Sequence, residues 1–364
     1  MTIDLSALAG LTVLDLSTRL PGPLATLMLA QAGARVIKIE RPPGEEFREY
    51  QPQVAGMSAH YAWLNRGKEC VALDLKHDSD RKEFDRLLET ADVLVEQFRP
   101  GVMDRLGLGY SQLSAKHPGL IYCAVTGYGQ HDPRSMTAAH DLNYQASAGL
   151  AGVVPAGGPR NVPPLPPVLL GDIAGGSYPA VMSILLAILQ RRHTGRGQFL
   201  DIGMARNLEV FNFWATISGH LTGAWAQPGT TRHGGGSPRY NLYTARDGKV
   251  LAVAALEDRF WQDFLDGIGL ELPQDKEKKD PQGVIDLVAS RIATADAAEW
   301  LHRLEGKDAC CNLVLAPSDV AGENARHTGT SVATDERTLP HIALPFASQF
   351  DRVGSPLPAW RESE

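Results

Sequence analysis

"LTVLDLSTRLPGPLATLMLAQAGARVIKIE", residues 11–40, reads as a strand, a helix and a second strand in succession. Residues 11–17 and 34–40 are rich in β-forming side chains, and residues 23–33 have helical spacing that ends at Gly33, a residue suited to close a helix. A helix between two such strands carries the chain back to the edge where the first strand began. The stretch therefore predicts two parallel strands joined through a helix.

The same alternation continues along the next ninety residues. Residues 82–91 predict a helix and residues 92–98 a strand, and residues 113–129 give the end of a helix followed by the strand "LIYCAVT". Repeated alternation of this kind is typical of a parallel sheet covered by helices on both faces. We therefore expect an α/β fold.

The second half of the chain changes character. A Pro/Gly-rich loop is expected at 152–167, and a strongly apolar helix at 175–195 precedes the strand in "RGQFLDIGM". After a second loop at 226–240, the sequence predicts a hairpin that turns at Asp247-Gly248. A helix, a charged loop at 273–283 and a helix-helix-strand series follow. With 364 residues, of which 43% are hydrophobic, the chain is long enough for two domains.

Composition excludes several function classes. The longest apolar runs are too short for a membrane span, and the net charge of −7 argues against broad nucleic-acid binding. There is no signal-peptide pattern, and the spacing of the four cysteines is not that of a metal or redox motif. We therefore expect a cytoplasmic protein with reduced thiols. The chain lacks GxGxxG after its first strand, a Walker A loop, HExxH and GxSxG, so we expect no nicotinamide, nucleoside triphosphate or metal site.

Three ionisable residues have mostly small or apolar neighbours in the sequence. "AAHDLNYQASAG", residues 138–149, contains His140 and Asp141, and "LLGDIAGGS", residues 169–177, contains Asp172. His140 can be a core histidine bonded to a carbonyl, or it can be incidental to an Asp141 that caps a helix. Asp172 can cap the helix that we expect to begin near Gly175. The alternative is that all three belong to an active site.

Several motifs, in order, resemble the family III CoA-transferase superfamily, also called CaiB/BaiF, and within it most closely the α-methylacyl-CoA racemases. The resemblance runs from residue 8 to about residue 320. It rests on "GLTVLDLSTRLPGPLATLMLAQAGARVIKIERPPG", "ADVLVEQFRPGVMDRLGLGY", "GYGQ", "HDLNYQASAG", "GDIAGGS", "RRHTGRGQFLDIGM" and "RDGKVLAVAALEDRFW".

The resemblance implies a domain organisation. Residues 1–205 would form a large Rossmann-like α/β domain to which residues 326–364 return. Residues 206–225 would form a linker helix, and residues 226–325 a smaller α+β domain. Family members form interlocked homodimers, so a second copy of this chain is the expected partner.

The resemblance also implies a chemistry. Racemases of the family move a proton at the α-carbon of an acyl-CoA thioester with two bases, which here would be His140 and Asp172. Glu257 would support the histidine, and Asp141 would help to set the protonation of the pair. Transferases of the family instead use the aspartate at position 172 as a nucleophile that becomes a CoA thioester. No cofactor is expected beyond the CoA of the substrate. A protein that binds CoA thioesters without turnover is a third interpretation, which the presence of both bases disfavours.

The family motifs also match positions expected to hold CoA. They are Arg41, Leu73, Lys76, Gln97, Phe98, Arg99, Met103 and Arg105. Three residues depart from the racemase pattern: Ala139 replaces a usual Gly, Asp258 a usual Pro, and Arg239 stands in a Gly-rich segment where racemases have Phe. These departures suit either a different acyl group or a transferase that retains His140.

Overall fold

The structure is a computed structural model that describes residues 6–157, 162–321, 332–334, 337–339, 342–345 and 356–360. The chain forms two compact units. The first comprises residues 1–148, 168–210 and 328–364, and the second comprises residues 149–167 and 211–327. The second unit thus includes the Pro/Gly-rich loop and residues 211–225. The expected division placed the Pro/Gly-rich loop in the large domain and residues 206–225 in a linker helix.

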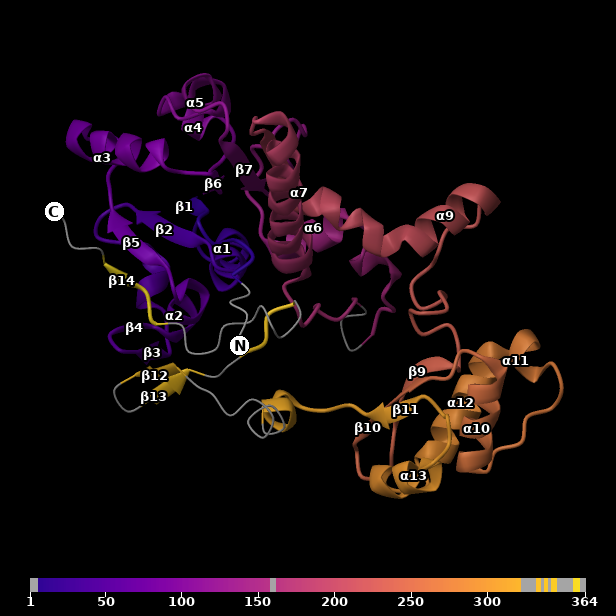
Figure 1. Cartoon of the computed structure of the whole chain (residues 1–364). Coiled ribbons are helices and arrows are strands. Elements are labelled where there is room, and N and C mark those ends of the chain that lie inside the picture. The colour runs from indigo at the N-terminus through magenta and orange to yellow at the C-terminus, as the bar shows by residue number, and fades with distance from the viewer. Residues whose placement is uncertain are drawn as a thin grey trace. The chain divides into compact units, whose positions relative to one another are not determined.

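A seven-stranded sheet, parallel throughout, organises the first unit (Figure 1). It confirms the predicted α/β class. Its strand order is β14-β5-β2-β1-β6-β7-β8. The strands are β1 (Thr12–Leu16), β2 (Arg35–Glu40), β5 (Glu69–Ala72), β6 (Val93–Glu96), β7 (Ile121–Thr126), β8 (Phe199–Gly203) and β14 (Ala359–Trp360).

Helices cover both faces of this sheet, as predicted (Figure 1). Leu14 and Leu16 of β1 point to the face covered by α3 (Asp78–Glu89), α4 (Val102–Arg105) and α5 (Tyr110–Lys116). The opposite face carries α1 (Pro21–Gln31), α2 (Ala59–Asn65) and α7 (Tyr178–Thr194). The period of two along β1 thus places Leu14 and Leu16 on one side, and the buried Val13 and Asp15 on the other.

The strand order creates a switch point between β1 and β6. From β1 the chain adds β2 and then β5 on one side, and it then returns to place β6 on the other side of β1. The loops that follow β1 and β6 therefore leave the sheet in opposite directions. A crevice opens between them at the carboxyl ends of the strands, which is where open α/β sheets bind their ligands.

Shorter elements complete the first unit. They are η1 (Glu46–Glu49), β3 (Gln53–Val54), β4 (Met57–Ser58), α6 (Asp141–Ser147), η3 (Gly171–Ser177), α8 (Met204–Asn207), β12 (Val332–Thr334) and β13 (Arg337–Leu339). The short helix η4 (Glu209–Asn212) leads into the second unit.

The predicted apolar helix begins earlier than the sequence indicated. The expected start was near Gly175, but the helical stretch begins at Gly171 with η3, a π-helical segment that continues into α7. Asp172 therefore lies inside the helical stretch, and the interpretation of this residue as a helix cap is wrong. By length and composition alone, Gly171–Thr194 is long and apolar enough to cross a membrane. The core helix of a soluble protein can have the same length and composition, so this helix is weak evidence for a membrane span.

The second unit is built on an antiparallel sheet of β9 (Tyr240–Thr244), β10 (Val250–Ala254) and β11 (Cys311–Leu313). The predicted hairpin is confirmed, and its loop runs from Ala245 to Lys249. The core of the second unit lies between this sheet and three helices, α10 (Asp258–Ile268), α12 (Pro281–Ile292) and α13 (Ala297–Leu304). The charged loop at 273–283 contains a helical turn that was not predicted, α11 (Lys276–Lys279), and α12 begins within it. The unit also holds η2 (Ala151–Val153) and α9 (Phe213–Thr222).

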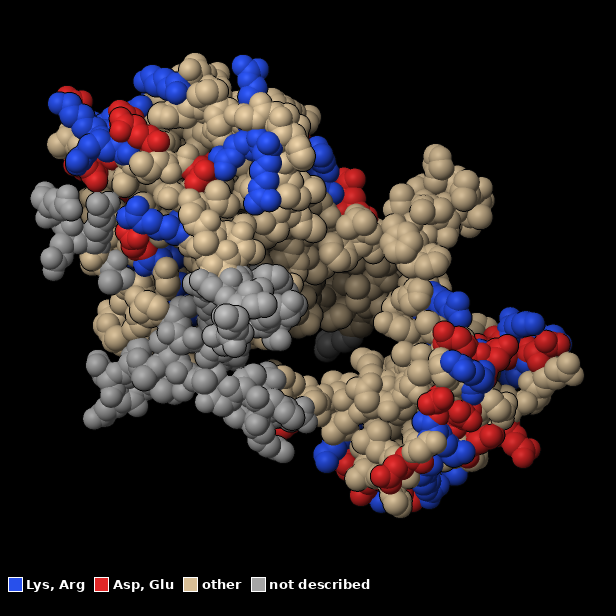
Figure 2. Space-filling model, viewed as in Figure 1, with Lys and Arg blue, Asp and Glu red and all other residues tan. Residues whose placement is uncertain are grey.

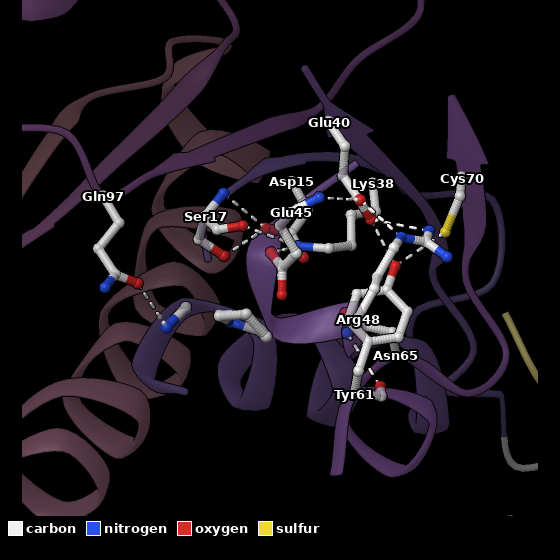
Figure 3. A network of polar contacts seen from close by, with 12 residues as sticks. Asp15, Ser17, Lys38, Glu40, Glu45, Arg48, Tyr61, Asn65, Cys70 and Gln97 are labelled. Carbon is white, nitrogen blue, oxygen red and sulfur yellow. Dashed lines mark hydrogen bonds and ion pairs between the residues drawn. The ribbon is translucent and has the colours of Figure 1, made fainter. Parts of the chain in front are cut away.

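A buried ionic network lies under the first βα loop (Figure 3). Asp15 and Lys38 are register partners on β1 and β2, and both side chains are fully buried. Lys38 Nζ donates to the carbonyl oxygen of Ser17 at 2.7 Å, and Lys68 Nζ lies 3.1 Å from Asp15 Oδ2. Burial alone would raise the pKa of Asp15, but the ammonium groups of Lys68 and Lys38 outweigh it and hold the pKa well below its usual range. The network fixes the chain where β1 ends.

Lys68→Met should destabilise the protein because it leaves the buried Asp15 carboxylate short of one cation. Breaking a buried pair costs about 3–5 kcal/mol, whereas replacing both partners costs far less. We expect a clear fall in Tm for Lys68→Met, followed by circular dichroism, and partial recovery in Asp15→Asn/Lys68→Met. The exposed Lys116→Met is the matched control. Equal Tm values for Lys68→Met and wild type would contradict a structural role for this pair.

Candidate functional site

A cavity of about 520 Å³ lies at the carboxyl ends of the central strands, where the strand order predicts a crevice. Residues that follow β1, β6, β7 and β8 contribute to its wall. Its lining comprises Thr18, Arg19, Pro21, Gln97, Phe98, Arg99, Pro100, Val125, Thr126, Gly127, Ser135, Thr137, Ala138, Ala139, His140, Asn143, Tyr144, Asp172 and Met204. His140 and Asp172, 32 positions apart in sequence, thus face one cavity.

His140 occupies the position just before α6. Its backbone N–H donates to Asn143 Oδ1 at 3.0 Å, and its carbonyl accepts from the backbone N–H of Asn143 at 2.8 Å. The residue is exposed and lines the cavity, so the interpretation of His140 as a buried core histidine is wrong. Asp141 is not the capping residue either, because it is the first residue of the helix.

Asp141 ties α6 to η3. Its Oδ1 accepts the backbone N–H of Asp172 at 2.9 Å, and its Oδ2 accepts from Gln145 Nε2 at 2.6 Å. Gln145 also donates to the carbonyl oxygen of Val168 at 3.1 Å. These bonds hold the start of η3 against α6 and so fix Asp172 relative to His140.

Burial and the neighbouring carboxylate change the acidity of Asp172. Burial raises its pKa, and the negative charge of Asp141 raises it further, to about 6. A carboxyl group with a pKa near neutrality can both accept and return a proton at the pH of a cell. Such a shift in a cavity marks a functional-site candidate.

Two glycines permit the close packing of η3. A Cβ on Gly175 would stand 2.5 Å from the carbonyl oxygen of Met204, a distance that real Cβ atoms do not reach. A Cβ on Gly171 would stand 3.0 Å from Asp141 Oδ1 and 3.2 Å from the Tyr144 side chain. The small residues in "GDIAGGS" therefore let η3 approach α6 and α8.

The profile of CoA-transferase family III matches residues 8–359. The chain belongs to this family. The resemblance drawn from the sequence motifs is thereby confirmed.

Relatives within the family have different activities. Human alpha-methylacyl-CoA racemase is 33% identical over 347 residues, which cover 93% of this chain and 86% of the racemase. Acetyl-CoA:oxalate CoA-transferase from Acetobacter aceti is 35% identical over 303 residues, which cover 80% and 76% of the two chains. A crystal structure of a CaiB/BaiF family protein from Brucella suis superposes with a TM-score of 0.81 at 25% identity, covering 97% of this chain and 96% of that one.

Three of the residues predicted to hold CoA follow β2 and β5. Arg41 is exposed, and its Nε lies 3.5 Å from Asp74 Oδ2, whereas Lys76 is exposed in the loop before α3. Leu73 is buried and donates its backbone N–H to the carbonyl oxygen of Glu40 at 2.9 Å. All three lie near the carboxyl edge of the sheet, and none lines the cavity of His140 and Asp172.

The remaining CoA candidates follow β6. Gln97, Phe98 and Arg99 line the cavity, and Gln97 Oε1 accepts the backbone N–H of Gly22 at 3.2 Å, which joins this loop to the start of α1. Met103 is buried, and with Arg99 it also lines a second cavity of about 280 Å³. Arg105 is exposed at the end of α4.

Glu257 belongs to the second unit. It is exposed and immediately precedes α10, where its carbonyl accepts the backbone N–H of Trp261 at 2.9 Å. Its side chain is thus accessible to a second copy of this chain, and its role beside His140 stays a prediction.

Two departures from the racemase pattern are explained by each other. Arg239 Nη1 lies 2.6 Å from Asp258 Oδ1, and Arg239 Nε lies 2.8 Å from Glu277 Oε1. Arg239 also donates to the carbonyl oxygen of Leu256 at 3.2 Å. The pair therefore joins the Gly-rich segment to the residues on either side of Glu257, and the charge of Arg239 is balanced within the unit.

Sequence reasoning missed several residues of the cavity wall. Thr18 and Arg19 follow β1, and Gly127 and Tyr144 approach from β7 and α6. The signal for Arg19 was present, since a cation directly after the first strand of a parallel sheet must lie at its ligand-binding edge. In the described ranges no group of three or more His, Cys, Asp or Glu is arranged to hold a metal ion.

Asp172→Asn should stabilise the folded protein above pH 6. Because the folded state raises the pKa of this carboxyl to about 6, whereas its pKa in the unfolded chain is about 4, its ionisation opposes folding increasingly between these two pH values and fully above pH 6. We expect a gain of about 1–3 kcal/mol at pH 8, seen as a higher Tm, that disappears below about pH 3, where the carboxyl is protonated in both states. The exposed Asp308→Asn is the control. A variant no more stable than wild type at pH 8 would show that folding does not raise the pKa of Asp172.

Proposed function

We propose that this chain is a racemase or epimerase of 2-methyl-branched acyl-CoA thioesters. The observation that carries the proposal is that His140 and Asp172 line one cavity, and that Asp172 has a pKa near neutrality there. Similarity to the human alpha-methylacyl-CoA racemase supports it.

Proton transfer between the two bases accounts for the reaction. One base removes the proton from the carbon beside the thioester, and the electron pair moves into the carbonyl to give an enolate. The conjugate acid of the other base delivers a proton to the opposite side of that carbon, and the carbonyl re-forms. Each base then regains its starting state by exchange with solvent. A residue with a pKa near the working pH suits this exchange.

CoA would be held along the carboxyl edge of the sheet. Arg41, Lys76, Arg99 and Arg105 supply cations for its phosphates, and each Arg–phosphate contact is worth about 1.5–3 kcal/mol. Arg99 lies at the boundary of the two cavities and is therefore placed to meet the part of CoA nearest the thioester.

The proposal includes an interlocked homodimer in which Glu257 acts in the partner's site. An exposed apolar surface on α9 and its neighbours supports it, since large surfaces of this kind mark interfaces. Figure 2 shows no charged residue on the visible face of α9. The surface comprises Phe211, Phe213, Trp214, Ile217, Leu221 and Trp225.

The cytoplasmic location stays a prediction.

Deuterium incorporation tests the reaction class. Incubation of the wild-type protein with one 2-methylacyl-CoA epimer in deuterated water should place deuterium at C2 and yield both epimers without an acceptor acid. His140→Ala should slow this exchange by about 10²–10⁴-fold, the usual contribution of a general acid–base group. The exchange is followed by mass spectrometry. If His140→Ala exchanges at the wild-type rate, His140 is not one of the bases.

The same incubation separates the racemase from a CoA transferase. In a transferase, the Asp172 carboxylate would attack the thioester carbonyl and expel the CoA thiolate, which forms an anhydride. The thiolate would then attack the Asp172 carbonyl of that anhydride and release the acyl group as a free carboxylate, so the peptide "LLGDIAGGS" would carry CoA as a thioester. We expect no such adduct in the wild-type protein. An adduct that hydroxylamine removes, with CoA passing to a free carboxylate and no deuterium at C2, would replace the racemase by the transferase.

Mixed refolding tests the shared site. In an interlocked dimer, His140→Ala and Glu257→Ala chains yield one site with both wild-type residues only when they fold together. We expect two inactive preparations to regain activity after joint unfolding and refolding, and not after simple mixing. Recovery on simple mixing, or a folded monomer at nanomolar concentration, would contradict interlocking.

A further inference from the structure

Arg19 adopts an unusual backbone conformation at the switch point of the sheet. Its φ is +63°, in the left-handed region that glycine adopts freely and that other residues adopt at a cost. It lies in the loop between β1 and α1, where Ser17 is already anchored by Lys38. Non-glycine residues held in this conformation cluster at functional sites. The backbone conformation therefore marks Arg19 as a candidate functional residue.

The side chain of Arg19 has weak partners. Its Nη2 lies 3.3 Å from Glu46 Oε2, and its Nη1 donates to the Tyr50 hydroxyl at 3.3 Å. The side chains of Arg19 and Glu46 are 52% and 73% exposed, and such surface pairs contribute little to stability. A second carboxylate can therefore replace Glu46 without breaking a buried structure.

Charge in the cavity indicates what Arg19 would bind. Asp172 lines the same cavity, and the buried Asp141 lies against it, so an acyl group that carries a carboxylate would be repelled unless a cation balanced it. The cations assigned above to CoA are Arg41, Lys76, Arg99 and Arg105. Arg19 is a further cation on the wall of this cavity, and its guanidinium has the fork geometry that matches a carboxylate.

We propose that Arg19 binds a carboxylate at the far end of the acyl group, so that the preferred substrates are 2-methyl-branched acyl-CoA thioesters of dicarboxylic acids. This inference rests on the proposed racemase function. The carboxylate would take the place of Glu46 on the guanidinium, with the Tyr50 hydroxyl nearby as a second donor.

The test compares two charged ligands with their neutral counterparts. 2-Methylsuccinyl-CoA and 2-methylglutaryl-CoA are each compared with the corresponding ω-amide, which has the same shape and no charge. Dissociation constants are measured by calorimetry, and deuterium exchange at C2 is measured in parallel. Wild-type protein should bind at least one acid about 10- to 100-fold more tightly than its amide, the usual effect of a charge-assisted hydrogen bond.

Variants assign this preference to Arg19. Arg19→Gln should remove the preference for the acid and leave binding of the amide within about twofold. Glu46→Gln should bind the acid more tightly, because it removes the competing carboxylate. Arg35→Gln is the matched control. Arg35 likewise pairs with a glutamate, Glu69, at the surface, but it is the first residue of β2 and so lies at the edge of the sheet away from the cavity.

Three outcomes would overturn the proposal. One is equal wild-type affinity for acids and amides. Another is equal weakening of both by Arg19→Gln, which would assign Arg19 to a phosphate of CoA. The third is a preference that survives in Arg19→Gln. The proposed racemase function fails separately, when neither acids nor amides exchange deuterium at C2, because the binding comparison does not depend on turnover.

Discussion

The hydrogen bond from the backbone N–H of Asp172 to Asp141 Oδ1 is the contact on which the site depends. It joins η3 to α6, and His140 stands at the start of α6. The same carboxylate that fixes the position of Asp172 also raises its pKa. Asp141 thus fixes where the second base lies, and its charge adds to the effect of burial on how readily that base exchanges a proton.

The sheet supplies the frame for that contact. Because β2 and β6 flank β1, the loops after β1 and β6 diverge and leave the cavity between them. The buried ions Asp15, Lys38 and Lys68 hold the end of β1, and Gln97 links the loop after β6 to α1. The fold therefore fixes the cavity walls by buried polar contacts as well as by apolar packing.

Local pattern predicted most of the fold but little of this polar interior. Residues 11–40 showed β1, α1 and β2 because propensity and period act within a few residues. The π-helical segment that begins at Gly171 contacts Asp141 and packs closely on Met204, which are distant in sequence, whereas the local pattern indicated a helix start near Gly175. Likewise, Arg239 and Asp258 looked like two unrelated departures until the fold paired them. His140 and Asp172 stood out by their apolar neighbours in the sequence, and family motifs suggested their roles, but their common cavity required the structure.

The most direct test of this account is the titration of the Asp172 carboxyl carbon by nuclear magnetic resonance, assigned by its loss in Asp172→Asn. The account predicts a pKa near 6 in the wild-type protein, and a lower pKa in Asp141→Asn, which removes the neighbouring charge. A wild-type pKa near 4, the ordinary value for an aspartate, would contradict it. So would a pKa that Asp141→Asn leaves unchanged.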